Sequence, residues 1–183
     1  DGNKWTDLTP DQVDLQKYTI LTHVSLGLQK LHDMSILHRD IKCNNVLLDG
    51  EHTGRECENC GAAGRWKICD FGEAKVLKSE TTGKPDPTST ISRDEADTSV
   101  TPAYASPELL NGEGIGLPSD IYSFGILCWE VFTRQEAWHW IHGANKSEAI
   151  TFQVMMENRR PKIPHGLAQG CAEKIRRCIS MNP

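Results

Sequence analysis

No apolar run in this chain approaches the roughly 20 residues that a membrane-spanning helix needs. The first residues also lack the basic start and the apolar stretch of a secretory signal peptide. Positive charge is not in excess either, since 20 Lys and Arg stand against 25 Asp and Glu, which gives a net charge of −5. The sequence therefore predicts no membrane segment within these 183 residues and no nucleic-acid partner.

The seven cysteines do not have the even number and regular spacing of a disulfide framework. A reducing environment fits them better, so we expect a cytoplasmic location. Cys57 and Cys60 have the spacing of half a zinc site, with His52 and Cys69 as candidates to complete it. Because a second cysteine pair is missing, a plain surface insertion is favoured over a metal site.

Two stretches have the patterns of helices. Thr9 and Gln12 can form a capping box around Pro10, and apolar residues follow at spacings of three and four, which predicts a helix over residues 10–32. The run 121–132 is apolar on nearly every face, so we expect a helix in the middle of the core. The basic pairs at 159–160 and 176–177 are expected to be solvated.

Two short β-prone runs, 45–48 and 66–69, predict a hairpin with a long loop. Residues 78–99 are almost all polar and predict a mobile loop that buries little apolar surface. Three alternating glycines at 112–116 are expected to form a flexible connector rather than a phosphate-binding loop, because no strand precedes them. The predicted fold class is mainly α with a small β-hairpin.

One segment carries a chemical pattern. In His38-Arg39-Asp40-Ile41-Lys42-Cys43-Asn44-Asn45 a carboxylate precedes an amide by five residues on one loop. Such a carboxylate can accept the proton of an attacking hydroxyl while the amide oxygen reaches a metal ion. Three further motifs follow in order: Asp70-Phe71-Gly72, then Thr101-Pro102-Ala103-Tyr104-Ala105-Ser106-Pro107-Glu108, then Ser119-Asp120-Ile121-Tyr122-Ser123-Phe124-Gly125.

In this order, these four motifs resemble those of protein kinases. The resemblance covers nearly the whole chain and implies the C-lobe of an α+β two-lobed fold whose N-lobe is absent. Residues 1–183 would then be a partial kinase domain, with the catalytic loop at 38–45, the activation segment at 70–108 and an insertion at about 50–64. The chain offers no Gly-rich loop, no β3 lysine and no helix glutamate to pair with it, so we expect a fragment of a longer kinase.

The resemblance assigns roles residue by residue. Asp40 would orient and deprotonate the substrate hydroxyl, and Lys42 would offset charge on the transferring phosphate. Asn45 and Asp70 would bind the ATP cofactor by holding the Mg²⁺ ions that bridge its phosphates. The implied partners are a protein substrate, ATP and an upstream activating kinase.

Further residues would have structural or regulatory roles. Arg39 would pair with a phosphate on the activation segment, and Asp120 would accept backbone N–H bonds from the catalytic loop. Thr101 would belong to the peptide-positioning loop, and Glu108 would pair with an arginine that is expected beyond residue 183. His38 is expected to pack and to form hydrogen bonds, without acid–base work.

The type of substrate is implied by a mixture of features. Lys42 and Thr101 resemble serine/threonine kinases, whereas residues 123–130 and the pair Arg160-Pro161 resemble tyrosine kinases. That mixture is characteristic of the tyrosine kinase-like group, which usually acts on Ser and Thr. Val100 departs from the family, which commonly has Gly there. A pseudokinase or scaffold, or a product that only binds partners, remains the alternative. Phosphorylation at Thr98 or Ser99 is expected to activate the enzyme.

Overall fold

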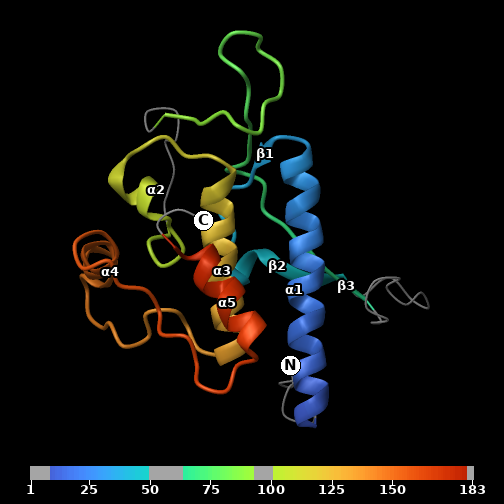
Figure 1. The fold of residues 1–183 in the computed structure, drawn as a ribbon, viewed down its shortest axis with the longest axis vertical. Helices are drawn as coiled ribbons and strands as arrows, with labels where there is room; N and C mark the ends of the chain where they lie inside the picture. Colours follow the sequence, from blue (N-terminus) through green and yellow to red (C-terminus); the bar gives the residue numbers. More distant parts are fainter. Residues whose placement is uncertain (1–8, 50–63, 93–100, 181–183) are drawn as a thin grey trace.

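A computed structural model describes residues 9–49, 64–92 and 101–180. The elements follow one another as α1 (Pro10–Asp33), β1 (Ile36–Leu37), a 3₁₀ turn η1 (Cys43–Asn45), β2 (Val46–Asp49), β3 (Arg65–Ile68), β4 (Lys75–Val76), α2 (Pro107–Asn111), α3 (Leu117–Thr133), α4 (Lys146–Met155) and α5 (Gln169–Cys178). Figure 1 shows α3 between α1 on one side and α2 and α4 on the other, with α5 lying against it. Among the described residues no helix is long and apolar enough to cross a bilayer.

The first helix is the one that the sequence predicted, with its end one residue further on. The backbone N–H of Gln12 donates to Thr9 Oγ1 at 3.4 Å, and the Thr9 N–H donates to Gln12 Oε1 at 2.9 Å. This reciprocal cap satisfies two N–H groups that the first turn leaves free. Ile20, Val24 and Leu28 are buried on one face, which packs in a cluster with Leu127 and Ile41.

Helix α3 is the core element, as its apolar sequence predicted. Ile126 and Leu127 are completely buried, on faces that belong to different apolar clusters. On the side toward α5, a Cβ placed on Gly125 would lie 2.6 Å from Cβ of Cys178 and 2.7 Å from Cγ2 of Ile179. Only glycine lets the two helices approach this closely.

The predicted hairpin is present. Strands β2 and β3 are antiparallel, with Val46 opposite Ile68 and Asp49 opposite Arg65. The pairing continues through a hydrogen bond from the Cys69 N–H to the Asn45 oxygen at 2.9 Å, although Asn45 belongs to η1 rather than to the strand. A second short antiparallel pair joins β1 to β4. Two small sheets thus connect the segments that carry the first two motifs.

The described part of the polar loop is more organised than its composition predicted. Ile91 exchanges backbone hydrogen bonds of 2.9 and 3.0 Å with Ile115. Both are buried in a cluster with Leu37 and Leu77. The prediction that residues 78–99 bury little apolar surface is therefore wrong at Ile91. This one apolar side chain is buried because Ile115, which holds its backbone, belongs to the same apolar cluster. Residues 93–99 lie outside the described part of the chain.

The three alternating glycines form a connector between α2 and α3, as predicted, but flexibility does not explain them. A Cβ on Gly114 would lie 2.9 Å from Oγ1 of Thr90. Gly112 ends α2 with a left-handed φ of 72°. The glycines therefore allow a left-handed helix end and a close approach to the loop at 90–91.

Arg160 corrects another expectation, since it is half-buried rather than solvated. Its Nε donates to the Ile179 carbonyl at 2.8 Å, and Nη1 donates to the Val154 carbonyl at 3.3 Å. The guanidinium also lies 5.5 Å from the centre of the Tyr122 ring. Arg160 thus ties the connection after α4 to the end of α5.

Candidate active site

The segment 38–45 is held by a carboxylate from α3. Oδ2 of Asp120 accepts the backbone N–H of His38 at 2.8 Å, and Oδ1 accepts that of Arg39 at 2.9 Å. His32 adds a contact at 3.0 Å between Nε2 and Oδ2. Asp120 is 1% exposed, so these bonds form away from water, where an unpaired charge would cost most. The backbone bonds that the sequence predicted for Asp120 are present.

Two residues of the motifs have a backbone conformation that side chains other than glycine rarely adopt. Arg39 has a φ of 69° and Asp70 a φ of 64°. Such conformations cost about 1–3 kcal/mol each and persist only where surrounding contacts enforce them. The bond from the Arg39 N–H to Asp120 is one such contact. The two strained positions are the residue before Asp40 and Asp70 itself.

The carboxylate of Asp40 is the centre of a small polar cluster. Nζ of Lys42 lies 2.7 Å from Oδ2 of Asp40. Nδ2 of Asn45 lies 2.8 Å from the same Oδ2 and 2.8 Å from the Asp40 backbone oxygen. The Asp40 side chain is 17% exposed, so a substrate group can still reach it.

These contacts fix the orientation of the Asn45 amide. Both atoms facing its nitrogen are acceptors, so the nitrogen must point toward Asp40 and the oxygen must point elsewhere. Asn45 is buried, and its backbone oxygen is bonded to Cys69, the residue before Asp70. The bonds to Asp40 thus leave the amide oxygen of Asn45 unused, and the backbone of Asn45 is bonded to the residue that precedes Asp70.

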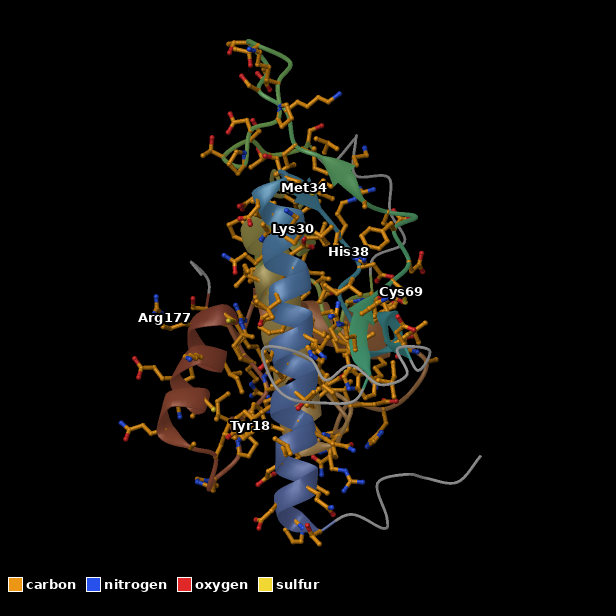
Figure 2. The ribbon with its side chains drawn as sticks, turned by 90° about the vertical axis from the view of Figure 1, so that its right-hand side faces the viewer. Tyr18, Lys30, Met34, His38, Cys69 and Arg177 are labelled. Atoms are coloured by element: carbon orange, nitrogen blue, oxygen red, sulfur yellow. The ribbon has the colours of Figure 1, made fainter. Side chains whose placement is uncertain are left out.

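The buried ring of His38 connects the segment 38–45 to the segment that carries Asp70. The Asp40 N–H lies 3.3 Å from Nδ1 of His38, and Nε2 lies 3.2 Å from the Cys69 carbonyl oxygen. Since a carbonyl only accepts, the proton must be on Nε2 and Nδ1 must be the acceptor. The ring is fully buried and makes an edge contact with Phe71 at 5.0 Å. Figure 2 shows His38 and Cys69 on the same side of α1. As predicted, His38 packs and bonds.

Asp70 has an exposed carboxylate, and its Oδ1 accepts only a long bond from the Gly72 N–H at 3.4 Å. A carboxylate and an amide oxygen are the hard ligands that Mg²⁺ prefers, and Mg²⁺ is usually held by one or two protein ligands together with substrate phosphates. Within residues 9–49, 64–92 and 101–180 there is no group of three His, Cys, Asp or Glu side chains that could hold a metal ion by itself. The donor set of Asn45 and Asp70 fits a magnesium ion that shares its coordination with phosphate.

Arg39 faces a carboxylate that the sequence did not single out. Its Nη2 lies 3.3 Å from Oε2 of Glu73, and its Nε donates to the Glu73 backbone oxygen. The remaining nitrogen, Nη1, is buried and has no hydrogen-bond partner among the described residues. Burial lowers the pKa of Arg39, and the negative charges of Glu73 and Asp120 offset part of this effect. The described residues thus leave one strong donor of Arg39 unused.

A second network joins the catalytic-loop segment to residues 101–106 and was also missed. The Tyr104 hydroxyl donates to the carboxylate of Glu130 on α3, and the Cys43 N–H points at the same hydroxyl at 3.5 Å. Burial, helped by Glu130, raises the pKa of the Cys43 thiol to about 12 and that of Tyr104 well above its usual range. The sequence feature that could have indicated this network is Glu130, a single glutamate within the apolar run 121–132.

The two remaining candidates have different surroundings. Thr101 and Asp40 line the same small cavity of about 10 Å³, so the structure brings the two segments together. Glu108, at the start of α2, accepts a bond of 2.8 Å from Oγ of Ser119, the neighbour of Asp120. It is bonded to α3 rather than to the catalytic-loop segment. The candidate zinc residues His52, Cys57 and Cys60 lie outside the described residues.

Similarity to known proteins extends over nearly the whole chain. The family described as the protein kinase domain matches residues 8–183. Dual specificity protein kinase shkC of Dictyostelium discoideum is 29% identical over 187 residues, which cover 100% of this chain and 32% of that protein. Serine/threonine-protein kinase CTR1 of Arabidopsis thaliana is 30% identical, over 94% of this chain and 18% of that protein.

A further Arabidopsis thaliana relative, serine/threonine/tyrosine-protein kinase HT1, is 30% identical over 87% of this chain and 34% of its own length. The chain spans about a third or less of the length of these relatives. Because the family match covers almost every residue, the chain belongs to the protein kinase family.

Proposed function

We propose that the chain is the substrate-binding and catalytic half of a serine/threonine kinase that transfers the γ-phosphate of ATP to protein hydroxyls. The observation that carries this proposal is the cluster around Asp40, with Lys42 at 2.7 Å and Asn45 at 2.8 Å from its carboxylate. A noncatalytic scaffold of this family has no need to keep a carboxylate, a cation and an amide in contact. The pseudokinase alternative is therefore not favoured.

In the proposed reaction, Asp40 accepts a hydrogen bond from the substrate hydroxyl and takes up its proton. The hydroxyl oxygen forms the new phosphate ester as the bond between the γ-phosphorus and the β,γ-bridging oxygen of ATP breaks and ADP leaves. Lys42 already contacts that carboxylate, so its ammonium is placed to offset negative charge on the phosphate. Asn45 and Asp70 would hold magnesium through their oxygens. When bound, magnesium offsets the charge of the ATP phosphates.

The choice of Ser and Thr is supported by the ammonium of Lys42 beside Asp40 and by the segment that begins at Thr101. One relative is named a serine/threonine kinase and another a dual specificity kinase. Detection of phosphotyrosine in the product would therefore contradict strict serine/threonine specificity. Tyr104 holds the 101–106 segment against Glu130 and thereby against α3. We infer that this segment positions the peptide.

The experiment that tests the proposal uses a kinase domain that includes these residues. With labelled ATP and a generic protein substrate, Asp40→Asn should reduce turnover at least about 10²-fold, the lower range for loss of a general base. Asp14→Asn is the matched control, because this carboxylate lies on α1, is exposed and pairs with Lys17 at 3.0 Å. Phosphoamino acid analysis should yield phosphoserine and phosphothreonine. Near wild-type turnover of Asp40→Asn would refute the mechanism.

We infer further that residues 1–183 are an incomplete domain. The sequence contains no Gly-rich loop over the phosphates and no lysine–glutamate pair to grip them, and both are parts of a complete kinase. Phosphoryl transfer depends on positioning and charge stabilisation, so residues 1–183 alone should show no robust turnover once shown to be folded. Robust turnover would contradict this inference but leave the role of Asp40 intact.

A further inference from the structure

A large groove lies at the end of α3 that is remote from the catalytic-loop segment. It has a volume of about 990 Å³ and lies between the end of α3, the connections on either side of α4, and α4 itself. Along α3, Asp120 and Thr133 are separated by roughly 20 Å, at a rise of 1.5 Å per residue. In Figure 1 the two connections run in orange and red-orange below α4. None of the residues assigned to catalysis lines this groove.

Aromatic side chains form one part of its lining. Trp129 and His139 are stacked, with an interplanar angle of 21° and ring centres 6.2 Å apart. Trp140 packs edge-on against His139 at 5.1 Å and is 40% exposed. His139 and Trp140 are exposed, whereas Trp129 is 3% exposed and supports His139 from behind. The groove therefore offers the rings of His139 and Trp140 to an apolar side chain, and half-exposed aromatic residues of this kind are the usual anchors of binding sites.

The charged part of the lining is entirely basic, although the chain as a whole has a net charge of −5. Arg159, Arg160 and Lys162 line the groove, and no Asp or Glu is among the lining residues. Arg159 is partly offset by Glu157, which lies 3.0 Å from its Nε. Arg160 bonds only to carbonyl oxygens, and Lys162 is exposed, so neither charge is neutralised by a carboxylate among the described residues.

One polar atom in the lining also lacks a partner. Oε1 of Gln153 on α4 is buried and accepts no hydrogen bond from any residue that the structure describes. A buried acceptor without a donor costs about 1–3 kcal/mol. Gln153 lines the groove, so a rotation of its side chain that exposes Oε1 would let a ligand N–H group remove this cost. A peptide backbone supplies such a donor at every residue except proline.

We propose that this groove binds an acidic peptide segment of a protein partner, with an apolar side chain on the aromatic wall formed by His139 and Trp140. Acidic side chains of the peptide pair with Lys162 and Arg159 at the rim, and a peptide N–H donates to Gln153. The basic lining selects negative charge, and the open aromatic wall selects an apolar anchor. This binding site does not depend on the proposed kinase activity.

The groove is also connected to the peptide-positioning segment. Trp138, next to His139, is fully buried, and its Nε1 donates to the Ala103 carbonyl at 3.2 Å. The Ala137 N–H donates to Oε1 of Glu130 at 2.7 Å, and the other oxygen of Glu130 accepts from Tyr104. A partner held in the groove is thus attached behind the segment that we infer positions the substrate.

The test is a selection from a random twelve-residue peptide library against the immobilised kinase domain that includes these residues. Selected peptides should carry net negative charge and an aromatic or long aliphatic residue. A fluorescein-labelled copy of a selected peptide should bind Lys162→Glu and Trp140→Ala at least about tenfold more weakly, because one rim charge or the anchor surface is lost. Lys174→Glu, an exposed charge on α5, is the matched control and should bind like the wild type.

Selected peptides that are basic or uncharged would overturn the proposal, as would no selection at all. Equal binding to Lys162→Glu and the wild type would overturn it too. A concentration-dependent dimer in sedimentation that Lys162→Glu abolishes would show that a second copy fills the groove instead. Thermal unfolding of each variant shows whether it is folded, and binding is measured without ATP, so loss of kinase activity does not affect the result.

Discussion

Asn45 donates through one amide nitrogen to both the backbone oxygen and the carboxylate of Asp40, each at 2.8 Å. These two bonds link the ends of the segment 40–45 and orient the Asp40 carboxylate. They also determine which atom of the amide remains for a ligand, because the nitrogen is already used. The proposed proton acceptor and the proposed metal ligand therefore position each other.

Asn45→Ala and Asp70→Ala should raise the magnesium concentration needed for half-maximal activity by at least about tenfold, because each removes an oxygen that we assign to a hard cation. Asn44→Ala is the control, since its side chain is exposed beside Asn45. Titrating magnesium at fixed ATP measures the effect. If both variants had the magnesium dependence of Asn44→Ala, the ligand assignment would be wrong.

Gly125→Ala should lower the free energy of unfolding by about 1–3 kcal/mol, because the added methyl group would collide with Cys178 and Ile179. The matched substitution is Gly170→Ala in α5, where nothing lies within 4 Å of an added Cβ. There, the better helix propensity of alanine should stabilise the protein by up to about 1 kcal/mol. Urea unfolding of both variants measures the difference. Equal effects at the two sites would show that α3 and α5 do not pack as described.

The long elements could be predicted from the sequence because their signals are local. The capping residues Thr9 and Gln12 lie only three positions apart in the chain, and the apolar period of α1 repeats over many turns. Contacts between distant segments could not be predicted in this way. Nothing near Arg39 in the sequence indicates that Glu73 faces it, because that contact depends on the antiparallel pairing of β1 and β4.

The same limit applies to the site. Resemblance to the family located Asp40, Asn45 and Asp70, and the backbone bonds of Asp120 followed from it. The contact of Tyr104 with Glu130 was missed, since a glutamate in an apolar helix has no local partner that would indicate its use. Ile91 was assigned to a polar loop because it is a single apolar residue whose neighbours in the core, such as Ile115, are distant in the chain, which leaves no periodic pattern.

His23 should make stability depend on pH in the acid range. Its Nδ1 accepts the Trp66 N–H at 3.2 Å and so links α1 to β3. Burial, and then the charge of Arg65, lowers the pKa of His23 below its ordinary value of 6.5. Because the unfolded chain then binds the proton more tightly, this contribution is fully present above about pH 6.5. It is lost as the pH falls through the lowered pKa.

The control for His23 is His23→Asn, which keeps an acceptor near the position of Nδ1 but does not titrate. The stability difference between wild type and variant should change between pH 8 and pH 5, with the wild type losing more toward acid. Chemical denaturation at a series of pH values measures it. A constant difference over that range would contradict a lowered pKa at His23.

Phosphorylation of the activation segment should raise activity through Arg39. One buried nitrogen of this arginine, Nη1, has no partner among the described residues, while Glu73 neutralises part of its charge. A phosphate carries about −1.5 to −2 charges and three acceptor oxygens, so it can compete with one carboxylate and also use the free donor. We place the phosphate at Thr98 or Ser99, which lie outside the described residues. Phosphatase treatment should therefore lower the turnover of the active enzyme.

Variants of Arg39 and of the phosphorylation sites distinguish activation through Arg39 from a general effect of phosphorylation. Arg39→Lys keeps a positive charge but loses the planar fork, so it should reduce the response to phosphatase, and Arg39→Ala should abolish it. The double variant Thr98→Ala, Ser99→Ala should have the low turnover of the dephosphorylated wild type, whereas Ser79→Ala, also in the polar loop, should not. Mass spectrometry of the active enzyme identifies the modified residue. If phosphatase left wild-type turnover unchanged, or lowered that of Arg39→Ala equally, the free donor of Arg39 would not be the phosphate's partner.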